Sequence, residues 1–302
     1  MLTFAAAHLI TTFQAIVLGF LQGVTELFPI SSLGHTVIFP HLFGWNNIVS
    51  WESEPESPWL AFVVMLHVGS SVGLLVYFWR EWVEIVRAFF ATLGKRRVET
   101  PTERLAWLII VATIPVGILG LVLEHPLRVL FAKPLAASFF LVVNGFILLF
   151  AERYRRRADV RELAEREGAK ADGARRLDTM DYREAGVIGV AQSSALIAGI
   201  SRDGVCMSAG LVRGLDNADA GRFAFLLATP PILAAGLYKI GDLTGPLGGG
   251  GVRGAALIAA IAAAITAFFS VRFLTRYFKA GNLRPFAYYC LAFGTVMTLA
   301  NL

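Results

Sequence analysis

The sequence predicts an all-α membrane protein: a polytopic helical bundle of inverted-topology repeats, with two re-entrant (broken) helices and about six full spans. Three observations predict this fold class. Hydrophobic residues make up 56% of the 302 residues and charged residues only 16%, whereas soluble domains average about 25% charged. Apolar stretches long enough to cross a bilayer recur along the chain. One polar pattern also occurs twice within apolar surroundings.

The predicted full spans are apolar stretches of roughly 17–25 residues, the length that crosses a bilayer as a helix. They cover residues 59–79, 105–123, 135–151, 222–240, 254–274 and 284–301. Segments 9–35 and 185–210 are also apolar, but Gly, Ser and Pro interrupt both near the middle. Irregular backbone survives at membrane depth only where protein or water satisfies its polar groups. We therefore expect both segments to be re-entrant or broken helices.

The two interrupted segments repeat one pattern without a gap. The aligned pairs are Gln22 with Gln192, Ile30 with Ile200, Ser31 with Ser201 and Gly34 with Gly204. A duplicated, glycine-broken segment inside an apolar chain indicates a site built between two repeats.

Loop charges predict the orientation. The connections 80–104 and 153–184 carry six and ten Lys or Arg residues, and segment 36–58 carries none. Basic residues gather on the cytoplasmic side, so the first two are expected inside and both chain termini outside. The spans that follow the two broken segments then run in opposite directions, which makes the halves inverted repeats.

We expect the first repeat over residues 1–151, a cytoplasmic charged linker over 152–184 and the second repeat over 185–302. The net charge of +5 follows from these cytoplasmic loops, so it does not indicate nucleic-acid binding. A homo-oligomer is compatible with the sequence.

The first broken segment carries a candidate carboxylate site. An ionisable residue at membrane depth, such as Glu26, costs about 2.5 kcal/mol or more to insert, and Gln22 lies on the same helical face. Gln22 and Glu26 are candidate metal ligands, and Glu26 is also a candidate base. Ser31 and Ser32 precede a helix start, where hydroxyl and backbone N–H groups can bind an anion. His35 is a candidate nucleophile or general acid, and the alternative is a capped surface imidazole.

The second broken segment carries a candidate anion site. Arg202 lies between Gly199 and Gly204, and its planar fork suits phosphate oxygens. Both glycines let the backbone approach a ligand closely. Glu26 is the alternative partner of Arg202 in the empty site, and a resting ion pair does not exclude phosphate binding. His67, within span 59–79, is expected to hydrogen-bond inside the bundle or to lie near the site.

These residues resemble a known family. The runs Gln22-xxx-Glu26-Leu-Phe-Pro-Ile-Ser-Ser-x-Gly-His35 and Gly199-Ile-Ser201-Arg202-x-Gly204 are similar to the two signature motifs of the undecaprenyl-diphosphate phosphatases, also called bacitracin-resistance proteins. The resemblance extends to the Phe-Ala-Phe-Leu-Leu-Ala-Thr-Pro run at 223–230 and covers nearly the whole chain.

The resemblance implies a membrane hydrolase of the bacterial plasma (inner) membrane. Its substrate would be a polyprenyl diphosphate lipid, cleaved to the monophosphate so that the lipid carrier of cell-wall synthesis is recycled. It also implies a divalent cation, Mg²⁺ or Ca²⁺, and an active site that opens to the outside. Ser32 and His35 match the catalytic Ser and His, while Ser201 and Arg202 match the Ser-Arg phosphate clamp.

The second motif departs from the family pattern at three positions. Ala198, Asp203 and Cys206 stand where the family usually has Pro, Ser and Thr. Asp203 would point away from the phosphate, hold a cation or hold one rotamer of Arg202; the alternative is that the chain is a divergent member of the family. The rival interpretation is a polyprenyl-phosphate transporter or flippase that uses the same Ser and Arg residues without hydrolysis.

Overall fold

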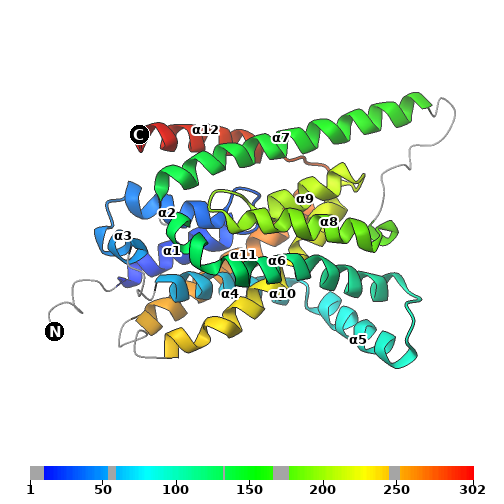
Figure 1. Cartoon of the computed structure of the whole chain (residues 1–302), viewed down its shortest axis with the longest axis horizontal. Coiled ribbons are helices and arrows are strands. Elements are labelled where there is room, and N and C mark those ends of the chain that lie inside the picture. Colours follow the sequence, from blue (N-terminus) through cyan, green and yellow to red (C-terminus); the bar gives the residue numbers. More distant parts are fainter. Residues whose placement is uncertain (1–9, 54–58, 132, 166–176, 245–251) are drawn as a thin grey trace.

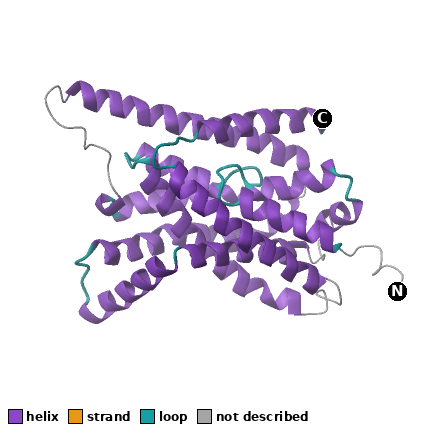
Figure 2. Cartoon of the chain, turned by 180° about the vertical axis from the view of Figure 1, so that it is seen from behind, coloured by secondary structure: helices purple, strands orange, loops and turns teal. Residues whose placement is uncertain are grey.

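The structure is a computed structural model that describes residues 10–53, 59–131, 133–165, 177–244 and 252–302. These residues form helices joined by short loops and contain no strand (Figure 2). The helices are α1 (Thr12–Thr25), α2 (Ser32–Leu42), α3 (Asn46–Ser53), α4 (Trp59–Tyr77), α5 (Trp79–Lys95), α6 (Pro101–Phe131), α7 (Pro134–Glu165), α8 (Tyr182–Ser193), α9 (Arg202–Val212), α10 (Asn217–Thr244), α11 (Val252–Tyr277) and α12 (Arg284–Ala300). The 3₁₀ turns η1 (Leu177–Thr179) and η2 (Ser194–Leu196) precede α8 and α9. The polytopic all-helical fold class is confirmed.

Five of the described helices, α4, α6, α7, α10 and α11, are long and apolar enough to cross a membrane. The sixth expected span is α12, whose 17 residues give a helix of about 25 Å. The connection at 80–104 contains a helix of its own, α5, and α7 continues past the expected end of its span to Glu165. The expected linker therefore begins as helix, and its residues 166–176 lie outside the described residues.

Both interrupted segments are broken helices, as predicted. The first divides into α1 and α2, which a turn over residues 26–30 separates, and the second divides into α8, η2 and α9 (Figure 1). The four α-helical pieces have 14, 11, 12 and 11 residues. Each is shorter than the roughly 20 residues that cross a bilayer, so their broken ends lie inside the bundle.

The two halves exchange packing partners. Helix α1 of the first half packs on α11 of the second, and α8 of the second half packs on α6 of the first. Helices α4 and α10 pack on each other, and so do α7 and α12, which run side by side along one edge (Figure 1). A pair of repeats related by a two-fold axis produces this pattern. The boundaries 1–151, 152–184 and 185–302 and the orientation in the membrane stay predictions.

Candidate active site

After the break in each interrupted segment, the next helix, α2 or α9, begins with the same N-cap hydrogen bond. Ser31 caps α2, and its Oγ accepts from the backbone N–H of Gly34 at 3.3 Å. Ser201 caps α9, and its Oγ accepts from the backbone N–H of Gly204 at 3.1 Å. An N-cap serine satisfies an N–H group that a helix start leaves without a partner. The Ser-to-Gly spacing shared by the two sequence copies is therefore a pair of matching helix caps.

The N-terminus of α2 and the loop that precedes α9 are in contact with each other. Ser31 Oγ also accepts from the backbone N–H of Gly199 at 3.1 Å. A Cβ on Gly34 would lie only 3.0 Å from the Gly199 Cα, and Gly199 itself has φ +100°. Side chains other than glycine are strained at that φ. The structure thus brings the two motif loops into backbone contact, and glycine permits this approach.

Asn144 of α7 ties both loops together. Its side chain is fully buried. Its Nδ2 donates to the carbonyl oxygen of Pro29 in the first loop at 3.0 Å, and its Oδ1 accepts from the backbone N–H of Ser201 in the second loop at 3.0 Å. A single amide offers both a donor and an acceptor. One side chain from an intact helix therefore fixes the two loops relative to each other.

Four side chains converge on the carboxylate of Glu26, which is only 6% exposed. Its Oε1 accepts from Arg202 Nη2 at 2.6 Å. Its Oε2 accepts from Gln22 Nε2 at 3.0 Å and from Ser32 Oγ, and His67 Nε2 lies 3.4 Å from the same oxygen. A buried carboxylate is tolerated when it is paired and hydrogen-bonded. The ion pair considered from the sequence is present, and it joins the two motifs.

His35 has other partners. Its Nδ1 lies 2.7 Å from the carbonyl oxygen of Ser31, and its Nε2 lies 2.8 Å from the Tyr289 hydroxyl. A carbonyl oxygen only accepts, so Nδ1 carries the hydrogen, and in the neutral ring Nε2 accepts from Tyr289. The ring also stacks on Tyr289 and Phe293 of α12. Its hydrogen bonds therefore go to the Ser31 cap and to α12, in contrast to those of Glu26.

Arg202 faces a second carboxylate. Asp203 Oδ1 lies 3.4 Å from Arg202 Nη2, and the Asp203 side chain is fully buried. Within the described part of the chain, neither Asp203 oxygen has a hydrogen-bond partner, and Arg202 Nη1 has none either. Of the three positions considered for Asp203, the structure shows the one beside Arg202.

Two polar residues of this site, the buried Asn144 and the half-buried His67, are not in the motifs. Asn144 lies within the apolar span expected at 135–151 and carries no expected role, while His67 was expected either in the bundle or near the site. A polar side chain inside an otherwise apolar span is itself a signal of function. The sequence alone does not show which loop such a residue faces, because that depends on how α4 and α7 pack against the broken helices.

Comparison with known proteins places the chain in a family. The model of the family described as bacitracin resistance protein BacA matches residues 15–296. The chain belongs to this family. Among its relatives, undecaprenyl-diphosphatase 2 of Frankia alni is 48% identical over 97% of this chain and 98% of the relative. The undecaprenyl-diphosphatase of Mycolicibacterium paratuberculosis is 50% identical over 95% of this chain and 96% of the relative.

The site of this BacA-family chain offers few atoms to a divalent cation by itself. Among the residues that the structure describes, no three His, Cys, Asp or Glu side chains gather closely enough to hold a metal. Gln22 Oε1, however, is buried beside Glu26 and has no hydrogen-bond partner among the described residues. Mg²⁺ usually binds one or two protein oxygens together with substrate phosphates and water. Gln22 and Glu26 fit that mode of binding.

Proposed function

We propose that this chain hydrolyses undecaprenyl diphosphate to undecaprenyl phosphate and inorganic phosphate, which recycles the lipid carrier of cell-wall synthesis. The relatives named undecaprenyl-diphosphatases align with nearly all of the chain. The observation that carries the proposal is the convergence of Arg202, Ser32 and Gln22 on the buried carboxylate of Glu26. This convergence places an anion-binding group, a hydroxyl and a base at one point. The same relatives favour hydrolysis over the transport alternative.

Phosphate binding is the role that we assign to the second loop. Arg202 Nη1 is a buried donor without a partner among the described residues, and a guanidinium binds phosphate oxygens through paired N–H groups. The Ser31 and Ser201 caps use the serine oxygen as an acceptor, which leaves each hydroxyl hydrogen to donate to a phosphate. Gly199 and Gly204 keep the backbone close to the bound group.

Ser32 and Glu26 supply the chemistry. Ser32 Oγ already donates to Glu26 Oε2, so Glu26 is positioned to accept its proton as a general base. The Ser32 oxygen attacks the terminal phosphorus, the bond to the bridging oxygen breaks and undecaprenyl phosphate leaves. Water then hydrolyses the phosphoserine, and Glu26 returns the proton. His35 supports the reaction by fixing the Ser31 carbonyl oxygen through a hydrogen bond. Arg202 stabilises the negative charge that develops on the phosphate in the transition state.

A divalent cation, Mg²⁺ or Ca²⁺, is part of the proposal. Glu26 and Gln22 would hold it, and it would neutralise phosphate charge in the bound substrate. On the basis of the loop charges, we further propose that both termini lie outside the cell and that the site opens to the outside.

The test is phosphate release from a prenyl diphosphate by purified protein in detergent, with and without Mg²⁺ or Ca²⁺. Arg202→Ala and Glu26→Ala are each expected to abolish release. Arg222→Ala is the matched control, because Arg222 forms an exposed ion pair with Glu81 through Nη2 at 2.6 Å, and it should retain near-normal turnover. Near-normal turnover in either site variant would refute the site assignment.

The order of the chemistry is tested separately. Rapid quenching of the reaction on substrate labelled in its terminal phosphate should trap label on the protein, and Ser32→Ala should remove it. Label that persists on Ser32→Ala would assign the covalent intermediate to another residue, and turnover in that variant without trapped label would show that water attacks directly.

A further inference from the structure

His67 of α4 is placed to act as a third ligand in the proposed cation site. Its ring Nδ1 lies 2.9 Å from the carbonyl oxygen of Val63, one turn back on the same helix. A carbonyl oxygen only accepts, so Nδ1 carries the hydrogen and Nε2 of the neutral ring carries the lone pair. A histidine that binds a metal usually donates its other ring N–H to a carbonyl or carboxylate oxygen. The backbone of α4 thus holds the ring in the tautomer that binds a metal.

The Nε2 atom of His67 faces a second acceptor. It lies 3.4 Å from Glu26 Oε2, and neither a neutral ring in this tautomer nor a carboxylate places a hydrogen between the two atoms. A doubly protonated ring would form a charge-assisted hydrogen bond, which measures about 2.7–2.9 Å. The observed separation is longer than such a bond. It matches two ligands of one metal ion, which lie about 3.0 Å apart at a right angle and about 3.4 Å apart at the tetrahedral angle for bonds of about 2.1 Å.

Gln22 brings a third acceptor to the same carboxylate oxygen. Its side chain is fully buried, its Nε2 lies 3.0 Å from Glu26 Oε2, and its Oε1 has no hydrogen-bond partner among the described residues. Rotation of the amide by half a turn exchanges its oxygen and nitrogen. The oxygen then lies beside Glu26 Oε2, at the separation of two ligands in one coordination shell. The same rotation removes the Gln22 N–H from Oε2 and leaves a lone pair for the cation, while Ser32 keeps its own hydrogen bond.

The site is closed on the carboxylate side and open on the histidine side. The side chain of Glu26 is 5% exposed, whereas that of His67 is 22% exposed. A catalytic metal site keeps at least one position for water or substrate. Water or a substrate phosphate therefore reaches the cation from the side of His67.

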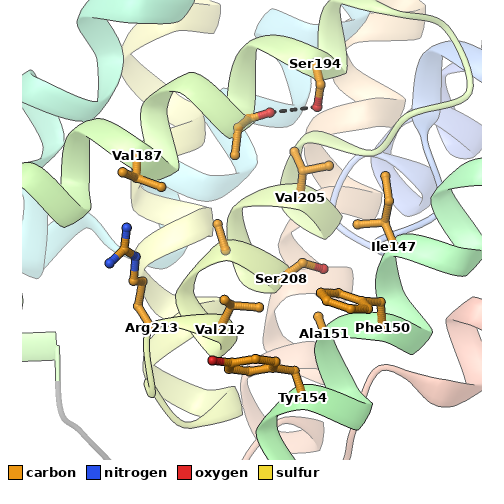
Figure 3. A pocket seen from close by; sticks show the side chains of 12 residues that line it. Ile147, Phe150, Ala151, Tyr154, Val187, Ser194, Val205, Ser208, Val212 and Arg213 are labelled. Carbon is orange, nitrogen blue, oxygen red and sulfur yellow. Dashed lines mark hydrogen bonds between the residues drawn. The ribbon is translucent and has the colours of Figure 1, made fainter.

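The groove between α7, α8 and α9, with a volume of about 510 Å³, is unsuited to a cation by comparison (Figure 3). Its lining residues include no carboxylate and no imidazole, and they include the positively charged Arg213. Divalent cations bind carboxylate, carbonyl or imidazole groups according to their softness. The ligand set around Glu26 is the better match.

We propose that His67 Nε2, Glu26 Oε2 and Gln22 Oε1 together bind one first-row transition metal ion, such as Mn²⁺ or Zn²⁺. Mg²⁺ and Ca²⁺ would bind the same three atoms more weakly, because these ions favour oxygen ligands whereas an imidazole nitrogen suits transition metals. The inference rests on the cation site of the proposed function, and it does not depend on hydrolysis.

The test measures metal binding and not turnover. The purified full chain in detergent is freed of metal with a chelator and titrated with Mn²⁺, with and without inorganic phosphate, while electron paramagnetic resonance measures free Mn²⁺. Bound Mn²⁺ should show nitrogen coupling from an imidazole in pulsed measurements, and Zn²⁺ should displace it at a lower concentration than Mg²⁺ or Ca²⁺. His67→Gln should abolish the coupling and weaken Mn²⁺ binding at least about tenfold, since even groups that only support a ligand contribute about 10–100-fold.

His41→Gln on α2 is the matched control. His41 Nδ1 lies 2.9 Å from the Val37 carbonyl oxygen one turn back, as His67 does on α4, but the contacts of Glu26 go to other side chains. This variant should keep both the coupling and the affinity. Wild type grown with ¹⁵N-histidine should show an altered coupling, which assigns the nitrogen to histidine even if His67→Gln does not fold.

Four results would overturn the proposal: bound Mn²⁺ without imidazole coupling, coupling that persists in His67→Gln, displacement of Mn²⁺ by Mg²⁺ or Ca²⁺ at a lower concentration than by Zn²⁺, or no Mn²⁺ binding in either condition. Imidazole coupling in a protein that releases no phosphate from a prenyl diphosphate would reject the proposed hydrolysis and support the ligand assignment. Hydrolysis without the coupling would reject the ligand assignment alone.

Discussion

Arg202 lies between two buried carboxylates and would have to accept a phosphate in their presence. Its Nη2 is 2.6 Å from Glu26 and 3.4 Å from Asp203. A negatively charged side chain near a phosphate-binding site opposes phosphate binding, and the repulsion is stronger where water is excluded. Asp203 therefore acts against phosphate binding, whereas Glu26 is also needed as the base in the proposed reaction.

Neutralising Asp203 should strengthen phosphate binding. We expect Asp203→Asn and Asp203→Ser to lower the inhibition constant of inorganic phosphate roughly tenfold, or about 1.4 kcal/mol, because the guanidinium then has one fewer carboxylate neighbour. Competition assays on prenyl diphosphate hydrolysis measure this. Asp181→Asn, at an exposed helix cap where Asn serves as well as Asp, is the control. An unchanged or higher constant in both Asp203 variants would contradict the charge argument.

Asn144 should matter as a positioning residue. Asn144→Ala removes a hydrogen bond to each loop, so kcat should fall at least tenfold with a smaller change in KM, and stability should fall by about 1–3 kcal/mol. Asn144→Asp keeps the acceptor for Ser201 but loses the donor to Pro29, so its kcat should lie between wild type and Asn144→Ala. Steady-state kinetics and thermal unfolding in detergent measure the two effects.

Ser138→Ala provides the control for Asn144. It lies on the same helix, and its hydroxyl bonds only one turn back, to the carbonyl oxygen of Pro134. Equal losses of kcat in Asn144→Ala and Ser138→Ala would show that α7 is merely destabilised and that no specific loop tie exists.

At the scale of helices, small residues set how closely the two halves approach. A Cβ on Gly69 of α4 would lie 2.2 Å from the Ala260 carbonyl oxygen of α11. Lipid tails are as apolar as the side chains of a membrane helix, so the hydrophobic effect does not drive helices together inside a bilayer. Small residues at helix contacts instead let the backbones approach closely and pack. The α4–α11 contact therefore depends on the absence of side chains.

Gly69→Ala should separate these helices. The added methyl group has no room, so we expect a loss of about 1–3 kcal/mol, read as a lower Tm in detergent. Gly117→Ala on α6 is the matched control, because a Cβ there meets nothing within 4 Å; it should leave the Tm unchanged or raise it, since alanine is the better helix former. A Tm for Gly69→Ala no lower than that of Gly117→Ala would mean that the contact can relax.

The broken helices could be predicted because local chemistry determines them. The Ser31–Gly34 and Ser201–Gly204 spacings are N-caps, and a cap is a property of a few adjacent residues. Helix α5 was missed because its basic residues made 80–104 look like a connection. The residues Asn144 and His67 could not be placed, since their partners lie on other elements and only tertiary packing brings them together. Glu26 and Arg202 were identifiable because charged side chains are rare at membrane depth.

At the scale of the whole molecule, the exchange of partners between halves explains why the site is single and central. Each motif loop lies at the break of a helix that packs against the opposite half, α1 on α11 and α8 on α6. The breaks therefore meet, and the two loops contribute different chemistry: a carboxylate and serine from the first, and an arginine from the second. Matching helix caps with unlike neighbouring side chains therefore give one asymmetric site.

The orientation of this bundle can be tested with cysteine labelling. The two native cysteines, Cys206 and Cys290, are buried, so they should stay silent toward a membrane-impermeant maleimide. Glu99→Cys lies in the loop between α5 and α6, and Asn301→Cys follows α12 at the other end of the fold. Because the basic loops are expected inside, intact cells should label Asn301→Cys but not Glu99→Cys, and lysed cells should label both. The reverse pattern in intact cells would invert the proposed topology and turn the site toward the cytoplasm.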